Sequence, residues 1–206
     1  MNKIDLKKNL KDLYNPKTNV IAEVLVPKMN FLMVDGKGDP NTSKEFVNAI
    51  EALYPVAYTI KFDIKKNLGK DYGVMPLEGL WWSSDLSDFA TGKKDNWFWT
   101  LMIMQPEFVT KDLFEKALES VKAKKHPAFI DKVRFESFEE GKSAQLMHIG
   151  PFAAEGPNIQ KIHDYIKEAG GKFDGMKQKH HEIYLSDMRK TAPDKLKTIL
   201  RQAFVK

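Results

Sequence analysis

Four tryptophans stand close together in the sequence and indicate a surface that could hold an aromatic compound. They flank one polar loop, as Trp81, Trp82, Trp97 and Trp99. Alternate residues of a strand share a face, so Trp97 and Trp99 should point the same way and Trp81 and Trp82 to opposite faces. For any single tryptophan, a place in the core is an equal alternative. For the cluster, we predict a stacking platform for a planar ligand, with an adaptable methionine lining that includes Met102.

A second group of reactive side chains falls on one predicted strand near the C-terminus. Period-two alternation places His180, Glu182 and Tyr184 on the same face of this strand. A carboxylate in the middle of a strand is unusual unless that face of the strand is exposed to solvent or has a function. In an apolar groove its pKa should rise, and it could pair with a cationic ligand or activate water. A plain solvent-facing strand is the alternative, and Glu78 is a competing carboxylate on another predicted strand.

Other kinds of chemistry find little support in the residues. The chain has no cysteine, so it has neither a disulfide nor a thiolate ligand or nucleophile. Its histidines are scattered, and His181-Glu182 is not followed by a second histidine at helical spacing. No phosphate-binding glycine loop and no Gly-x-Ser-x-Gly elbow occurs. We therefore predict no metal and no cofactor.

The charge and hydropathy patterns limit the partners of the chain. The net charge is +5 and the pI about 9.1, but the positive charge is mostly lysine, interleaved with acidic residues. Base readers favour arginine, and no nucleic-acid-binding motif is visible, so we expect no specific nucleic acid partner. Neither a signal peptide nor a membrane span is predicted, and the absence of cysteine fits a reducing compartment. We expect a cytoplasmic protein, and we favour a monomer.

A faint internal repeat indicates how these residues are positioned. Residues 31–36 precede a turn and a helix that begins near Ser43, and residues 145–150 precede a turn and a helix that begins near Asn158. Two strand–helix–strand–strand units side by side would share one antiparallel sheet, because neither can bury its sheet face alone. The predicted fold class is therefore α+β, with a pseudo-twofold sheet, helices on one face and a ligand groove on the other.

The remaining elements follow from periodicity and from turn residues. We expect a single domain over residues 1–206, with repeat one at about 18–106 and repeat two at about 128–187. Apolar spacing predicts a basic helix over residues 1–13, one long helix kinked at Pro55, and a helix over residues 110–125. Further predicted elements are strands over 20–26, 31–35, 73–82, 97–105 and 181–186, a hairpin of 133–138 with 143–149, a helix over 158–169, and a C-terminal helix over about 193–204.

Several of these blocks, taken in order, resemble the standalone GyrI-like small-molecule-binding proteins. The blocks are residues 77–82, 97–106 and 181–187, together with the helical segment 52–59. The resemblance implies two strand–helix–strand–strand repeats, and it covers nearly the whole chain. Relatives include effector-binding domains of multidrug-sensing activators, which bind lipophilic cations beside a buried glutamate. Some standalone members hydrolyse the strained cyclopropane of DNA-alkylating natural products.

Carried over to this sequence, the resemblance places the family glutamate at Glu182. It gives the role of proton donor to Tyr184, Tyr54 or Tyr58, and it leaves open which of them acts. With His148 added, the predicted site consists of catalytic Glu182 and Tyr184 and of ligand-binding Trp81, Trp82, Trp97, Trp99, Tyr54, Tyr58, Met102 and His148. The predicted partner is a flat hydrophobic molecule, cationic or electrophilic, and the predicted reaction is water addition to a strained ring. Binding without turnover is the alternative, and a nucleic-acid-associated or gyrase-inhibiting protein is a third hypothesis.

Overall fold

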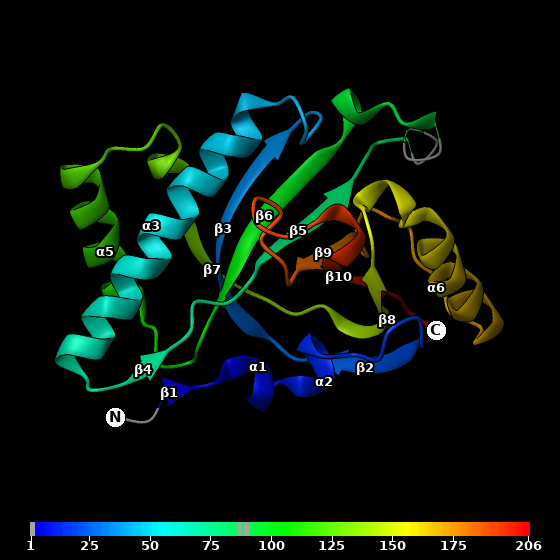
Figure 1. Cartoon of the computed structure of the whole chain (residues 1–206), viewed down its shortest axis with the longest axis horizontal. Coiled ribbons are helices and arrows are strands. Elements are labelled where there is room, and N and C mark those ends of the chain that lie inside the picture. Colours follow the sequence, from blue (N-terminus) through cyan, green and yellow to red (C-terminus); the bar gives the residue numbers. More distant parts are fainter. Residues whose placement is uncertain (1–2, 86–87, 89–90) are drawn as a thin grey trace.

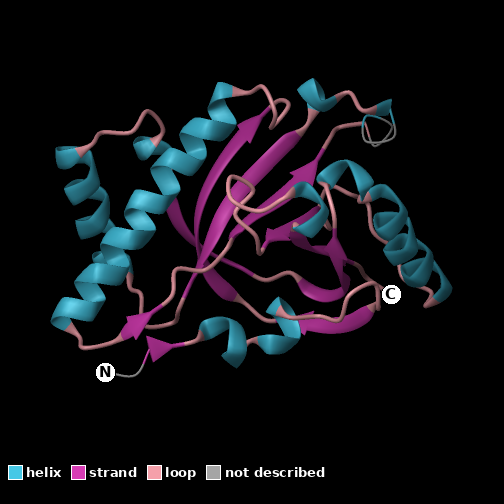
Figure 2. Cartoon of the chain, viewed as in Figure 1, coloured by secondary structure: helices cyan, strands magenta, loops and turns pink. Residues whose placement is uncertain are grey.

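One antiparallel sheet forms the body of the molecule in the computed structural model, which describes residues 3–85, 88 and 91–206 (Figures 1 and 2). Within these residues the sheet has eight strands, in the order β2-β8-β10-β9-β5-β6-β3-β7. The strands are β2 (Ala22–Val26), β3 (Met29–Lys37), β5 (Leu77–Trp82), β6 (Phe98–Gln105), β7 (Arg134–Phe138), β8 (Gly141–Ile149), β9 (His180–Tyr184) and β10 (Lys197–Ala203). A separate parallel pair joins β1 (Lys3–Ile4) to β4 (Asp71–Tyr72).

The helices are short, with three exceptions. The α-helices are α1 (Leu6–Asn9), α2 (Lys11–Tyr14), α3 (Lys44–Asn67), α5 (Lys111–Lys124) and α6 (Gly156–Glu168). The 3₁₀ turns are η1 (Lys94–Asn96), η2 (Ile130–Lys132), η3 (Phe152–Ala154) and η4 (Pro193–Lys195). The basic N-terminal helix expected over residues 1–13 is thus two single turns that abut at Leu10. No helix of the described residues is long and apolar enough to cross a membrane.

The two predicted repeats are present and meet in the middle of the sheet. The first comprises β3, α3, β5 and β6, and the second β8, α6, β9 and β10. They join where β5 pairs antiparallel with β9, with Gly79 opposite Glu182. The predicted hairpin of residues 133–138 and 143–149 is wrong, because β7 pairs with β3 and β8 pairs with β2 and β10. The strand before each repeat therefore extends the sheet of the other repeat, because β2 pairs with β8 and β7 pairs with β3.

Helix α3 forms as one long element because its apolar residues keep helical spacing through Pro55. Its buried residues include Leu53, Val56 and Ile60, and it ends just before Gly69, whose φ of 64° suits a chain that leaves a helix. Figure 1 shows α3 and α6 lying over the same face of the sheet, one on each repeat.

The predicted C-terminal helix over residues 193–204 is wrong, since this segment is the turn η4 followed by strand β10. β10 lies between β8 and β9, so residues on both of its faces are buried, Ile199 and Leu200 alike. The apolar residues Leu196, Ile199, Leu200 and Phe204 recur at helical spacing, and burial on both faces removes the alternation that would have indicated a strand.

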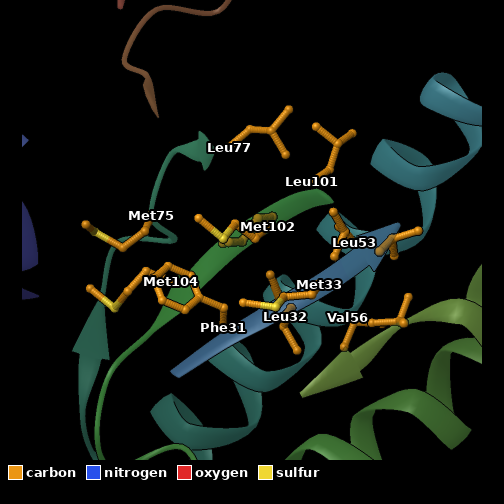
Figure 3. Packing of buried hydrophobic residues seen from close by; sticks show 14 of the residues in the cluster. Phe31, Leu32, Met33, Leu53, Val56, Met75, Leu77, Leu101, Met102 and Met104 are labelled. Atoms are coloured by element: carbon orange, nitrogen blue, oxygen red, sulfur yellow. The ribbon is translucent and has the colours of Figure 1, made fainter. Parts of the chain in front are cut away.

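The opposite face of the sheet carries a methionine-rich core. Figure 3 shows Met33, Met102 and Met104 near one another, with Met75 beside them. All four are buried, at 4 % exposure or less. The N-terminal segment belongs to the same core, because Leu13 and Tyr14 of α2 are buried within this cluster.

Candidate functional site

The junction of the two repeats holds a row of hydrogen-bonded polar and aromatic side chains. Trp81 Nε1 donates a hydrogen bond to the Tyr184 hydroxyl over 3.1 Å, and this hydroxyl donates to Glu182 Oε2 over 2.7 Å. His180 Nε2 lies 3.3 Å from the other oxygen, Glu182 Oε1. The Glu182 side chain is 16 % exposed. The row therefore holds the carboxylate in one orientation at the edge of solvent.

Gly79 makes room for this row. It stands opposite Glu182 in the sheet, and a Cβ at this position would lie 2.8 Å from Trp81 Nε1 and 3.2 Å from the Tyr184 hydroxyl. Real Cβ atoms essentially never approach another atom that closely. Glycine is therefore the residue that allows Trp81 and Tyr184 to meet above β5.

The row faces the helices, whereas the ligand groove was predicted on the other face of the sheet. Phe46 of α3 stacks on Trp81 with ring centres 5.9 Å apart. Leu200, which is paired with Glu182 in the sheet, packs with Ile162 of α6. Glu182 therefore lies between α3 and α6, on the face that they cover. The connection from β9 to β10 crosses the same gap in Figure 1.

Aromatic rings surround the row on its exposed side. Phe152 of η3 meets the Tyr184 ring edge-on at 5.7 Å, and Trp97 meets Trp81 edge-on at 5.9 Å. The half-buried Tyr54 of α3 stacks on Tyr58 at 6.3 Å. The pKa of Tyr54 is raised by burial and by Tyr58 and Asp187, and the charge of Arg189 acts against this. Asp187 and Arg189 belong to the β9–β10 connection, so Tyr54 lies close to it.

The electrostatics of the row favour a neutral tyrosine and leave negative charge without a cationic partner. Burial, followed by the charge of Glu182, raises the pKa of Tyr184 well above 10. Glu155, the residue before α6, is buried at 4 % exposure, and its pKa is raised to about 9 by burial and then by Glu182. In the described part of the chain, neither carboxyl forms an ion pair with a lysine or arginine.

The four tryptophans lie in three different places. Trp81 lies beside Tyr184 and Trp97 lies beside Trp81. Trp99 is fully buried, with its ring directly over Gly36 and edge-on to Phe46 at 5.3 Å. Trp82 lies on the opposite face, where it stacks on Phe98 and carries the Lys179 ammonium 3.5 Å from its ring centre. The expected alternation of Trp81 and Trp82 is confirmed, but the four rings do not form one platform.

Three other predicted residues also lie away from Glu182. Met102 belongs to the methionine-rich core on the opposite face, because its partner in β5 is Glu78. Tyr58 is 46 % exposed on the outer side of α3, in a groove of about 690 Å³ that α3 forms with α5. His148 shares the face of Glu182, but its ring nitrogens contact Asn158 Nδ2 and the Pro151 carbonyl.

Glu78, the competing carboxylate, belongs to a different network. It accepts a hydrogen bond from the Tyr14 hydroxyl at 2.8 Å and lies 3.0 Å from His181 Nε2. His181 Nδ1 lies 2.9 Å from Glu140 Oε2, and Arg201 Nη1 donates to the same oxygen over 3.1 Å. This buried network occupies the far face of β5 and β9, so Glu78 cannot replace Glu182 in the same site.

The sequence reasoning missed two features. The buried network joins residues far apart in the chain, such as Tyr14 and Glu78, and no local pattern indicates such a pairing. Glu155 precedes a Gly-Pro helix start, where an acidic residue is ordinarily explained by the helix dipole. Among the described residues, no group of three or more histidine, aspartate or glutamate side chains could hold a metal ion. Two of the surface grooves are lined by described residues alone, and these two include neither Glu182 nor a tryptophan.

Comparisons with known proteins agree with this architecture. A family model described as the GyrI-like small molecule binding domain matches residues 21–201. A search of curated proteins finds no significant match.

Solved structures extend the likeness to the whole chain. An uncharacterized conserved protein from Listeria innocua is 42 % identical, with a TM-score of 0.87 over 98 % of this chain and 100 % of that one. A hydrolase encoded by lin2189 from Listeria innocua is 43 % identical, with a TM-score of 0.85 over 99 % of this chain and 100 % of that one. The C-terminal domain of EcmrR shares the fold at 11 % identity, with a TM-score of 0.57 over 91 % of this chain and 98 % of that one. With a family model over most of its length, the chain belongs to the family of GyrI-like small-molecule-binding domains.

Proposed function

We propose that this protein binds flat hydrophobic molecules between α3 and α6 and opens strained cyclopropyl-type rings of alkylating compounds by adding water. The observation that carries the proposal is the Glu182 carboxylate, which is oriented by Tyr184, bordered by Trp81, and free of an ion pair with lysine or arginine among the described residues. Such a group can stabilise a developing positive centre or take a proton from water. Similarity to a hydrolase from Listeria innocua supports a hydrolytic role in general terms.

The proposed reaction starts with a water molecule placed between Glu182 and a ring carbon. Glu182 accepts a proton from the water, and the water oxygen bonds to the carbon while one carbon–carbon bond of the ring breaks. The electrons of that bond move into a conjugated carbonyl group of the substrate, whose oxygen takes up a proton. The product is the substrate plus one water, and no oxidant or cofactor is needed.

Tyr184 is the proton donor in this scheme. Its hydroxyl is 2.7 Å from Glu182, so a proton that Glu182 takes from water can return to Tyr184 as Tyr184 gives its own to the substrate oxygen. The pKa of Tyr184, well above 10, is incompatible with a free tyrosinate. Both transfers must therefore be coupled. Trp81, which donates to the same hydroxyl, keeps Tyr184 in place.

The approach to Glu182 is bordered by the turn that carries Phe152 and by the β9–β10 connection. Neither groove described above reaches Glu182, and Phe152 lies against the Tyr184 ring. We propose that the turn carrying Phe152 and the β9–β10 connection move aside when a ligand enters. We also propose that the protein acts as a cytoplasmic monomer with no specific nucleic acid partner.

Binding without turnover is the second candidate function. A carboxylate that lacks a lysine or arginine partner among the described residues suits capture of a lipophilic cation, and capture requires no reaction. Such a protein would sequester or sense drugs and toxins.

The test is incubation of the protein with a cyclopropane-bearing alkylator, followed by mass spectrometry for a ring-opened product that has gained one water. Glu182→Gln should lower the turnover rate by about 10²–10⁴-fold, because the variant keeps the shape of the side chain and removes its charge and basicity. Trp82→Phe, on the opposite face, is the matched control and should turn over normally. Binding in the absence of any water-added product would establish the second candidate instead.

A further inference from the structure

Glu155 is a buried acid that the proposed reaction does not use. Its backbone is fixed, because its carbonyl accepts hydrogen bonds from the amides of Asn158 and Ile159 at the start of α6. Its side chain is buried, and Oε1 has no hydrogen-bond partner among the described residues. An ionised carboxylate left in this state would lose its hydration without compensation. Glu155 therefore either carries a proton or awaits a partner.

The surroundings of Glu155 come from four elements and contain more acid than base. From β9, Glu182 raises the pKa of Glu155, and Glu155 in turn raises the pKa of Tyr184. From β10, the Thr198 hydroxyl is close enough to lower its pKa, although Thr198 Oγ1 itself lacks a hydrogen bond among the described residues. The histidines on this side of the sheet are His180 of β9 and His148 of β8, and α6 carries His163.

None of these histidines neutralises Glu155. His148 is engaged by Asn158 and Pro151, and His180 Nε2 faces Glu182. Burial lowers the pKa of His163 to about 4, so this ring is neutral near pH 7. In the β9–β10 connection, the Arg189 guanidinium donates two hydrogen bonds of 2.9 Å to the Asp187 carboxylate. The charge of Arg189 is therefore balanced by Asp187.

We infer that Glu155 is the second carboxyl of the ligand site: in the free protein it carries a proton, and a cationic ligand displaces that proton when it binds beside Glu182. The inference rests on the proposed binding of a ligand beside Glu182. Two carboxyl groups that interact electrostatically titrate as a coupled pair, and they lose their protons in separate steps. The first negative charge is present near pH 7, and the second appears when a positive charge enters.

This arrangement would let one site accept two classes of ligand. A neutral aromatic compound binds to the pair with its proton retained, so that a single negative charge remains beside it. A flat cation lowers the pKa of Glu155 and meets two negative charges once the proton has left. A nearby opposite charge commonly lowers a carboxyl pKa by about 1–3 units. The pair therefore adjusts the charge of the site to the charge of the ligand.

The expected size of the effect follows from the pKa of Glu155, about 9 in the free protein. If a bound cation lowers this pKa by about 2 units, roughly 0.8 proton is released per cation at about pH 8. On the same basis, affinity for the cation rises roughly 50-fold between about pH 6 and about pH 9. A neutral ligand of the same shape releases no proton and shows no such rise.

The test uses 1-methylquinolinium, a permanent flat cation, and 1-methylnaphthalene, its neutral counterpart. Both are titrated by calorimetry near pH 8 in two buffers with different heats of ionisation, and their affinities are followed from about pH 6 to about pH 9. The proteins are wild type and Glu155→Gln, which matches the shape of the protonated acid and so should fold. Glu155→Gln should bind the cation without proton release and with a flat pH profile, while the neutral ligand binds both proteins alike.

The outcomes separate the inference from the proposed function. If wild type binds both ligands but releases no proton with the cation, or if Glu155→Gln releases as much as wild type, the inference is wrong and the binding site stands. If wild type binds neither ligand, the proposed function fails, and the inference fails with it. A carbon-13 titration of the glutamate carboxyls in the free protein gives an independent check, because the resonance missing from Glu155→Gln should titrate near pH 9.

Discussion

Strand β9 carries ionisable side chains on both of its faces, and the two faces stabilise them differently. On the far face, His181 touches Glu78 and Glu140, and Arg201 neutralises Glu140 from the next strand. On the helix face, Glu182 contacts only Tyr184 and His180 among its described polar neighbours, and Glu155 adds a second carboxyl nearby. His181 and Glu182 are neighbours in the sequence. The charge of His181 is balanced by Glu78 and Glu140, whereas Glu182 has no lysine or arginine partner among the described residues.

The far face has the properties of a structural anchor. Although burial alone would raise the pKa of Glu140, His181 and Arg201 hold it at about 2. Burial alone would lower the pKa of His181, but Glu140 and then Glu78 raise it to about 9. Arg201 Nη2 also donates to the Leu13 carbonyl over 2.7 Å, and Gln145 donates to the Asp12 carbonyl over 2.7 Å. Each charged side chain of the network has an oppositely charged neighbour, although Glu140 Oε1 has no hydrogen-bond partner among the described residues. The network ties the N-terminal segment to the sheet.

The difference teaches that burial of a charged residue alone does not mark a site. The more deeply buried acid, Glu78, has its hydrogen-bond partners within the protein, and these bonds stabilise the fold. The acid with no lysine or arginine partner among the described residues, Glu182, has only His180 as a basic neighbour and has capacity left for a ligand. The missing counter-charge is the more informative signal.

The largest effect should come from breaking the compensated network. Glu140→Gln leaves His181 and Arg201 buried without their shared carboxylate, so the free energy of unfolding should fall by about 3–5 kcal/mol. Urea denaturation measures this loss. Glu139→Gln, at the exposed neighbouring position, is the matched control and should change little. Equal and small losses for both variants would show that the network is no anchor.

A smaller effect should follow from crowding the other face. Gly79→Ala brings a methyl group to within 2.8 Å of Trp81 Nε1, so the Trp81–Tyr184 hydrogen bond must break or shift. We expect a loss of about 1–3 kcal/mol in stability and weakened ligand binding. Gly73→Ala, whose Cβ would meet nothing closer than 3.7 Å, should change neither quantity. If Gly79→Ala retains stability and binding, the packed row of Trp81 and Tyr184 is not needed.

The smallest effect, counted for each pH unit, should be a change in the free energy of unfolding that depends on the protonation of Glu155. The carboxyl of Glu155 has an ordinary pKa of 4.5, raised in the folded protein to about 9 by burial and Glu182. Between these values the folded chain holds a proton that the unfolded chain has lost, so wild-type stability falls as the pH rises. Glu155→Gln is free of this loss, and its advantage over wild type should grow by at most about 1.4 kcal/mol per pH unit.

Urea denaturation of both proteins at several pH values between about 5 and about 8 checks this slope. Glu168→Gln, an exposed change on α6, should run parallel to wild type. A constant difference between Glu155→Gln and wild type over this range would contradict a protonated Glu155.

Much of the fold could be predicted because it depends on local periodicity. The helical spacing around Pro55 gave α3 as one element, and strand alternation correctly separated Trp81 from Trp82. Periodicity failed where both faces of a strand are buried, as in β10, and where pairing partners are distant, as for β7 with β3.

The site was predictable only in part. Alternation alone placed Glu182 and Tyr184 on one face, where a hydrogen bond joins them. It could not show that Trp99 fills the space above Gly36, or that Met102 lies behind the sheet, because both facts depend on tertiary packing. Glu155 comes close to Glu182 only because of how the second repeat folds, and no local sequence pattern indicates this proximity.

The most direct test of the contrast between the two faces is a tryptophan-fluorescence titration with 1-methylquinolinium at about pH 7. It compares Glu182→Gln with Glu78→Gln, two identical changes on adjacent strands and opposite faces. Glu182→Gln should weaken binding of the cation about tenfold or more, because the charge beside the ligand is lost. Glu78→Gln should destabilise the protein while the folded fraction binds within about twofold of wild type. Loss of affinity in Glu78→Gln, with Glu182→Gln binding like wild type, would place the ligand site on the wrong face and contradict the account.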